Sequence, residues 1–211
     1  MKAIKNKLTK KITRERLGKF LRAHKTTAYT LDIGCSGSRY ARYFPNRVGL
    51  DIEKGEGVDV VGDAHNLPFN DKTFDVVLCT EVLEHLYDPQ RAIDEMWRVL
   101  RDKGTLLLTT RFIFPIHNTP ARGGLYYFRY TPDGLRHLFR GRWDIKSIQA
   151  EASPKDTLAI LAQRAGRESK TLFGKAFWFT SARLIEYCPW RAQEPLLSSG
   201  YYVVCQKKIS T

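Results

Sequence analysis

The acidic residues that follow the early β-type runs are the best placed to do chemistry. Asp51 ends the run 47–51, and Asp63 follows the run 58–62. Ligands of open parallel sheets bind outside the carboxyl ends of the strands, where a carboxylate can accept hydrogen bonds from both hydroxyls of a ribose. Asp63 can accept from an adenine amino group while the backbone N–H of Ala64 meets a ring nitrogen. These positions predict an adenosine ligand.

A loop of small residues follows the first β-type run. Residues 32–38 read DIGCSGS, and their small side chains let backbone N–H groups approach a ligand. A dinucleotide fingerprint needs G-x-G-x-x-G, but Ser36 and Arg39 stand at the second and third glycine positions. The loop therefore favours a nucleotide ligand other than a nicotinamide dinucleotide.

The elements that must position these residues alternate between β-type runs and helical stretches, which is typical of a parallel α/β sheet. Asp88-Pro89 and Thr131-Pro132 each combine an N-cap residue with a first-turn proline and predict helix starts. The last run is expected to close the sheet at or near an edge. The seven predicted strands are 28–33, 47–51, 58–62, 74–80, 104–110, 143–148 and 201–206.

The chain length of 211 residues and 43% hydrophobic content fit a single globular domain. We expect a basic arm with short helices over residues 1–25 and one domain over 26–211. A long aromatic-rich insert at about 153–199 is expected to hold helices near 154–165 and 171–187. This insert can add a wall to an acceptor pocket, form a subunit contact, dock on a membrane surface, or simply contribute to the core.

The net charge of +13 is concentrated in the arm, where ten basic residues accompany Glu15. Such a cluster can attract nucleic acid, anionic lipid or an acidic substrate, although a solvated face is the favoured interpretation. The four cysteines are widely separated and form no metal-ligand pattern. No apolar run is long enough for a membrane span, and the N-terminus lacks a secretory signal, so a cytoplasmic location is expected.

Five motifs occur in order along residues 30–140: LDIGCSGSRY, VGLDI, VVGDAHNLPF, FDVVLCTEVLEHL and EMWRVL. Through them the chain resembles the class I S-adenosylmethionine-dependent methyltransferases, in particular the type 11 family. The resemblance implies a Rossmann-like three-layer sandwich with a mostly parallel seven-stranded sheet whose last strand is antiparallel. It also implies S-adenosyl-L-methionine as cofactor and methyl transfer as the activity.

Carried over from this family, Gly34 and its neighbours would hold the methionine part of the cofactor, Asp51 the ribose, and Asp63 with Ala64 the adenine. Ser36 and Ser38 replace glycines of the family's D-x-G-C-G-x-G loop, which bears on cofactor affinity more than on cofactor identity. No metal site is expected. The complete expected cofactor set is Asp32, Gly34, Cys35, Gly37, Asp51, Ile52, Asp63, Ala64, Cys79, Thr80 and Glu81.

His117 follows the fifth predicted strand and is the candidate catalytic residue, because an imidazole is suited to general base work near neutral pH. A loop histidine bonded to the backbone is the plainer alternative. Residues 117–130 can form a substrate lid or a flexible connection. The stretch 120–139 resembles a subgroup whose loop reads H-x-x-P-x-D-[YF]-x-R-[YF]-T, and Arg129, Tyr130 and Thr131 match its ending. Tyr126 stands at the position of the subgroup's Asp, so the role of that carboxylate does not transfer.

The leading hypothesis is a methyltransferase for a small-molecule, glycan or lipid-linked acceptor, with peripheral membrane contact left open. One alternative is an RNA or protein methyltransferase that docks through the basic arm, although no RNA-binding motif accompanies it. Another is a non-catalytic scaffold that keeps the fold. No oligomeric state is indicated.

Overall fold

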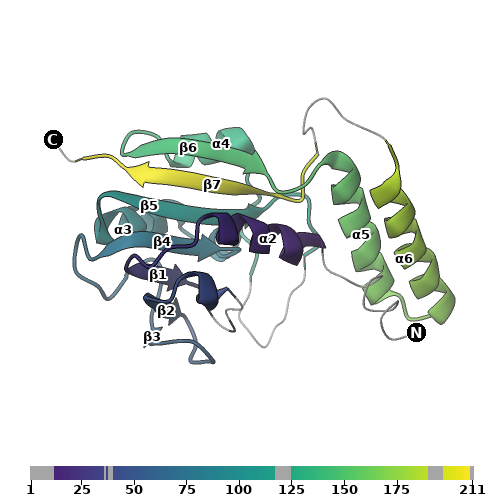
Figure 1. Ribbon diagram of the computed structural model, residues 1–211, viewed down its shortest axis with the longest axis horizontal. Helices are drawn as coiled ribbons and strands as arrows, with labels where there is room; N and C mark the ends of the chain where they lie inside the picture. The colour runs from purple at the N-terminus through teal and green to yellow at the C-terminus, as the bar shows by residue number, and fades with distance from the viewer. Residues whose placement is uncertain (1–11, 36, 38–39, 117–124, 190–196, 210–211) are drawn as a thin grey trace.

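The computed structural model describes residues 12–35, 37, 40–116, 125–189 and 197–209. A single seven-stranded sheet runs through it in the order β3-β2-β1-β4-β5-β7-β6 (Figure 1). Strands β3, β2, β1, β4 and β5 are parallel, whereas β7 is antiparallel to both β5 and β6. The strands are β1 Thr30–Ile33, β2 Arg47–Asp51, β3 Val60–Val61, β4 Phe74–Thr80, β5 Leu100–Arg111, β6 Trp143–Ala150 and β7 Gly200–Lys207.

This topology confirms the predicted fold class, including the antiparallel last strand. Strand β7 lies between β5 and β6, one strand in from the edge, and β6 forms the edge itself. The alternation of strands with helices is less regular than predicted. Only a short 3-10 turn, Ala41–Tyr43, lies between β1 and β2 in the described residues, and residues 52–59 and 62–73 contain no helix. The connection 52–59 includes Gly55 and Gly57, and Gly57 has a positive φ of 77°, which helices do not accommodate.

The two predicted helix starts are confirmed. The Asp88 side chain accepts a hydrogen bond from the backbone N–H of Arg91, and Pro89 begins helix α3 Pro89–Val99. The Thr131 hydroxyl accepts from the backbone N–H of Gly134 at the start of α4 Pro132–Leu138. The remaining helices are α2 Ile12–Ala23, α5 Pro154–Glu168 and α6 Leu172–Tyr187, with a 3-10 turn at Leu83–His85.

Alternating side chains of the sheet build two cores, because successive strand residues point to opposite faces. On one face, Val77 and Cys79 of β4 pack with residues of α3 and α4 such as Met96 and Leu135. On the other face, the strand residues Val76, Leu78 and Leu107 pack with α2 through Leu17, Phe20 and Leu21. The sheet is therefore the middle of three layers (Figure 1).

Helices α5 and α6 lie side by side beyond the end of the sheet toward which β4 points (Figure 1). They pack closely at Gly166, where a Cβ would lie 3.2 Å from Trp178. Several large apolar side chains of α6 remain exposed, among them Leu172, Phe173, Leu184 and Tyr187. None of the helices in the described ranges is both long and apolar enough to cross a membrane.

Basic residues of α2 have a structural use that the charge count did not predict. Arg16 donates to the backbone oxygen of Glu151 at 3.1 Å and forms an ion pair with Asp156 of α5 at 2.5 Å. The arginine therefore ties α2 to the base of the helical insert. The charge of Arg16 is therefore used for a contact within the protein.

Candidate functional site

Two of the predicted carboxylates, Asp51 and Asp63, line one cavity at the carboxyl ends of β2 and β3. The cavity has a volume of about 1040 Å³, which reaches the upper end of the size range of small-molecule sites. We call it the carboxylate cavity. Its other walls include Gly34, Gly37, Ile52, Ala64, Glu81, Val82, Tyr87 and Tyr126. The fold thus brings most of the predicted cofactor residues to one place.

Gly34 has to be glycine for two separate reasons. Its φ is +74°, in the left-handed region that favours glycine. A Cβ there would also lie 2.2 Å from Cγ2 of Val82, which follows β4. The end of β1 and the segment after β4 therefore approach more closely than a side chain would allow, and Gly34 and Val82 together line the carboxylate cavity.

The sequence predicts that backbone N–H groups of this loop face a ligand, but three of them donate to carbonyl groups of the protein instead. Gly34 and Cys35 donate to the carbonyl of Leu50 at 2.8 and 3.3 Å, and Gly37 donates to the carbonyl of Glu56 at 3.1 Å. The reason is that the loop still lies alongside β2 at Leu50 and then contacts the connection that follows β2 at Glu56. Gly34 and Gly37 therefore leave space in the wall of the carboxylate cavity, while the N–H groups of Gly34, Cys35 and Gly37 stabilise the loop.

Asp63 is positioned by His65. Its Oδ1 accepts both the backbone N–H of His65, at 2.9 Å, and a ring contact from Nδ1, at 2.6 Å. Burial alone raises the pKa of Asp63, but the hydrogen bonds from His65 outweigh it and leave the pKa below its usual value. The His65 ring stacks on Tyr87 at 4.1 Å, so an ionised carboxylate and an aromatic side chain form adjacent parts of the wall.

The other predicted residues divide into two groups. Glu81 lines the carboxylate cavity and also the smaller cavity described below, and Thr80 lines only the smaller one. Asp32 and Cys35 also face the smaller cavity, where Asp32 lies 3.5 Å from Arg47 and the Cys35 thiol donates to Gly57. Cys79 instead is fully buried in the core beneath the sheet edge, where burial raises its pKa.

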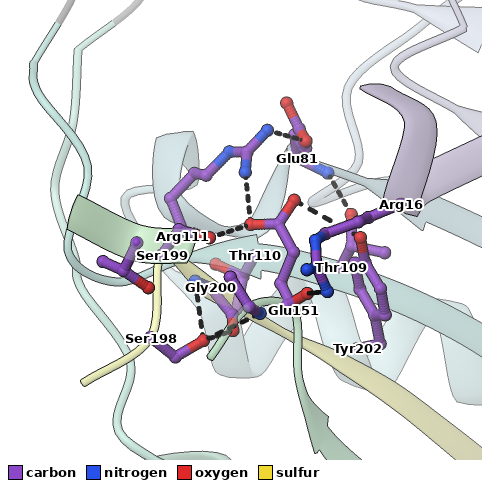
Figure 2. A network of polar contacts seen from close by, with 12 residues as sticks. Arg16, Glu81, Thr109, Thr110, Arg111, Glu151, Ser198, Ser199, Gly200 and Tyr202 are labelled. Atoms are coloured by element: carbon purple, nitrogen blue, oxygen red, sulfur yellow. Dashed lines mark hydrogen bonds and ion pairs between the residues drawn. The ribbon is translucent and has the colours of Figure 1, made fainter. Parts of the chain in front are cut away.

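A buried ion-pair network at the end of β5 was not predicted. Arg111 contacts Glu81 and, through its other terminal nitrogen, Glu151 at 2.6 Å (Figure 2). Ser199 and Tyr202 also donate to Glu151, at 2.5 and 3.3 Å. Burial by itself lowers the pKa of Arg111, but the two carboxylates outweigh it and raise the pKa. No local sequence pattern links Arg111 to Glu151, because Arg111 ends β5 and Glu151 follows β6, 40 residues later in the chain.

The smaller cavity has a volume of about 360 Å³ and lies between α2, α5 and the ends of β1, β4 and β5. It shares Arg14, Gly34, Gly37 and Glu81 with the carboxylate cavity, so the two are adjacent. We call it the basic cavity because Arg14, Arg111, Arg164 and Arg167 line it. The α5 side of this cavity was not predicted, since the sequence placed no functional residue on that helix.

Glu84, in the 3-10 turn that follows β4, is almost completely buried. It accepts a hydrogen bond from the Thr110 hydroxyl at 2.9 Å, and its backbone oxygen accepts from Tyr127. Burial, the largest cause, raises its pKa to about 7. The residue therefore joins β5 to the segment after residue 124.

The candidate base His117 and residues 117–124 of the expected lid lie outside the described residues. Further along that segment, Tyr126 lies 4.2 Å from the His85 ring, and Arg129 stacks over Tyr126 at 4.6 Å. Tyr126 and Tyr127 both line the carboxylate cavity. In the described ranges, no group of three or more His, Cys, Asp or Glu side chains is placed to hold a metal ion.

Comparison with known families gives a match over residues 31–108 to the sequence profile described as "Methyltransferase domain". A curated relative, norajmaline N-methyltransferase of Rauvolfia serpentina, is 47% identical over 90 residues, which are 33% of this chain and 31% of the relative. Demethylmenaquinone methyltransferase of Thermotoga maritima is 36% identical over 73 residues, covering 35% of this chain and 31% of that protein. The chain spans half or less of the length of the curated relatives it matches.

A solved structure resembles this fold over nearly its whole length. The 1,6-didemethyltoxoflavin-N1-methyltransferase of Burkholderia thailandensis, solved with 1,6-didemethyltoxoflavin and S-adenosylhomocysteine, has a TM-score of 0.60 and 14% identity. The alignment covers 94% of this chain and 79% of that protein. At this identity the likeness shows the fold alone.

Proposed function

Because residues 31–108 belong to the methyltransferase-domain family, we propose that the chain is an S-adenosylmethionine-dependent methyltransferase. We propose further that it acts in the cytoplasm on a small-molecule, glycan or lipid-linked acceptor. The observation that carries the proposal is the cavity where Asp51, Asp63 and Gly34 meet at adjacent strand ends. The exposed apolar side chains of α6 support an acceptor with a lipid part.

The residues of the carboxylate cavity fit an adenosine-containing cofactor. Asp51 ends β2, where its carboxylate can accept from both ribose hydroxyls. His65 holds the neighbouring Asp63 ionised, which suits an amino donor such as that of adenine. Gly34 leaves room at the junction with the basic cavity, where we place the methionine part.

Bound S-adenosylmethionine supplies a methyl group on a sulfonium, and the sulfur leaves as a neutral thioether when a nucleophile takes the methyl. What remains for the protein is to align the acceptor with the methyl group and to exclude competing water. In our proposal Gly34, Gly37 and Glu81, which line both cavities, surround the place where the two substrates meet.

The cofactor assignment is tested by calorimetric titration of the full chain with S-adenosylmethionine, S-adenosylhomocysteine and, as a control, NAD. We expect micromolar binding of the first two, near −8 kcal/mol, and no binding of NAD. If none of the three compounds bound, the methyltransferase proposal would be refuted, and a non-catalytic scaffold that keeps the fold would be favoured.

Replacing Asp51 with Ala is expected to weaken S-adenosylhomocysteine binding by about 3 kcal/mol, on the order of 100-fold, because two charge-assisted hydrogen bonds to ribose are lost. Calorimetry measures the affinity, and a thermal melt checks that the fold is retained. Asp133→Ala is the matched control, since Asp133 lies on α4 with its side chain 92% exposed. Unchanged affinity in Asp51→Ala would refute the assigned ribose site.

We propose His117 as the general base that removes a proton from the acceptor. His117→Ala should then lower turnover by about 10²- to 10⁴-fold with little change in S-adenosylhomocysteine affinity, as measured by initial rates and calorimetry. His137→Ala, on the exposed face of α4, serves as the control. Equal losses of turnover and cofactor affinity would point to structural damage instead of a lost base.

A further inference from the structure

The α5 wall of the basic cavity is distinct from the walls that the cofactor proposal uses. Gln163, Arg164 and Arg167 line the basic cavity, and no α5 residue lines the carboxylate cavity. Successive turns of α5 bring these side chains to one side of the helix, since residues three or four apart are neighbours on a helix surface. The wall therefore faces space beyond the positions assigned to adenosine.

Positive charge predominates on this wall. Arg14, Arg164 and Arg167 all line this cavity, and burial together with the charges of Arg164 and Arg14 lowers the pKa of Arg167. Within the described residues, the ion pair of Arg164 with Glu168 engages only the Nε edge of its guanidinium, at 2.6 Å. Like charges held together stabilise a bound anion, because the anion offsets their mutual repulsion.

The cavity also contains two carboxylates, but both already face arginines. Glu81 pairs with Arg111, which Glu151 contacts from the other side. Asp32 lies 3.5 Å from Arg47. The negative charge is therefore held at the strand ends, opposite the positive α5 wall.

Gln163 supplies an independent observation. Its side chain is 2% exposed, and its Nε2 amide has no hydrogen-bond partner among the described residues. A buried amide donor without an acceptor is unfavourable, so such a group at a cavity wall indicates a ligand that brings an acceptor oxygen. Arginine and amide donors together suit a carboxylate or a phosphate.

We propose that the methyl acceptor carries an anionic group, a carboxylate or a phosphate, and that Gln163, Arg164 and Arg167 bind it in the basic cavity. This inference rests on the proposed methyltransferase function. Arg14, which lines both cavities, lies between this anion and the cofactor. The alternative anion for this site is the carboxylate of the cofactor's own methionine part.

The test uses inorganic phosphate and acetate as probes of the full chain saturated with S-adenosylhomocysteine, at constant ionic strength set with sodium chloride. We expect at least one of the two anions to bind with a millimolar Kd by calorimetry. Gln163→Met and Arg167→Gln should each weaken that binding at least tenfold without changing S-adenosylhomocysteine affinity. Arg136→Gln, on exposed α4, is the matched control and should bind as the parent does.

Three outcomes separate the hypotheses. If neither anion binds the loaded protein, or if one binds only before S-adenosylhomocysteine is added, the anionic-acceptor proposal is overturned. It is also overturned if Arg167→Gln weakens S-adenosylhomocysteine but not 5′-methylthioadenosine, which lacks the carboxylate, because the site then serves the cofactor. Failure of the parent protein to bind S-adenosylhomocysteine would instead refute the methyltransferase proposal itself.

Discussion

Glu151→Ala is expected to lower the free energy of unfolding by about 3–5 kcal/mol, because it leaves a buried arginine without the more buried of its two compensating charges. Glu151 is 3% exposed and Arg111 is 5% exposed, so water cannot replace the lost carboxylate. Ser199 and Tyr202 also lose their acceptor. Urea denaturation at neutral pH, followed by circular dichroism, measures the effect as a shift of the unfolding midpoint.

A paired replacement shows whether the loss comes from charge. Combining Arg111→Met with Glu151→Leu removes both buried ions and should cost less than Glu151→Ala alone, since the one carboxylate left without its partner, Glu81, has a side chain that is 35% exposed. Asp133→Ala is the surface control, because the Arg136–Asp133 pair is exposed and such pairs contribute about 0–1 kcal/mol. If Glu151→Ala cost no more than this control, Glu81 alone would be sufficient to compensate Arg111.

The second large effect is a dependence of stability on pH that arises from Glu84. Its folded-state pKa is raised to about 7, above the usual value of an unfolded glutamate, so the folded state resists its ionisation. The stability this group contributes is present below about pH 4.5 and is lost as the pH rises toward 7. Glu84→Gln removes the ionisation and keeps an oxygen for the Thr110 hydroxyl, so it should be more stable than the parent by about 3 kcal/mol at pH 8 and nearly equal to it at pH 4.5.

Urea unfolding of both proteins at intervals between pH 4.5 and 8 measures this difference. Glu95 offers a contrast of opposite sign, because its hydrogen bonds to Arg98 lower its pKa. Its contribution to stability is present above the unfolded pKa and is lost as the pH falls. Glu95→Gln should therefore be less stable than the parent at neutral pH. A stability difference for Glu84→Gln that did not vary with pH would contradict the proposed cause.

If the basic cavity binds the acceptor, α5 performs two tasks at once. Asp156 at its start anchors Arg16 of α2, while Arg164 and Arg167 near its end face the cavity. The helical insert would then select the acceptor, and the sheet edge would hold the cofactor. This division is consistent with functional residues placed on segments that a rigid scaffold positions.

Features that depend on neighbouring residues could be predicted from the sequence alone. Asp88-Pro89 and Thr131-Pro132 predicted their helices, because N-cap hydrogen bonds and first-turn prolines act within four residues of the chain. The β-type runs predicted the strands, and their order implied that Asp51 and Asp63 would share one sheet edge. The assignment of His117 as the base stays a prediction.

Contacts between distant segments could not be predicted from the sequence and follow from the folded arrangement of the strands and helices. The N–H groups of Gly34 and Cys35 donate to the carbonyl of Leu50 because the loop after β1 still lies alongside β2. Arg111 contacts Glu151 because β7 pairs with both β5 and β6, which places the end of β5 near the residue that follows β6. The α5 wall faces the cavity only because the insert folds back over the sheet edge. Each of these contacts joins residues far apart in the chain, so no local propensity or spacing specifies it.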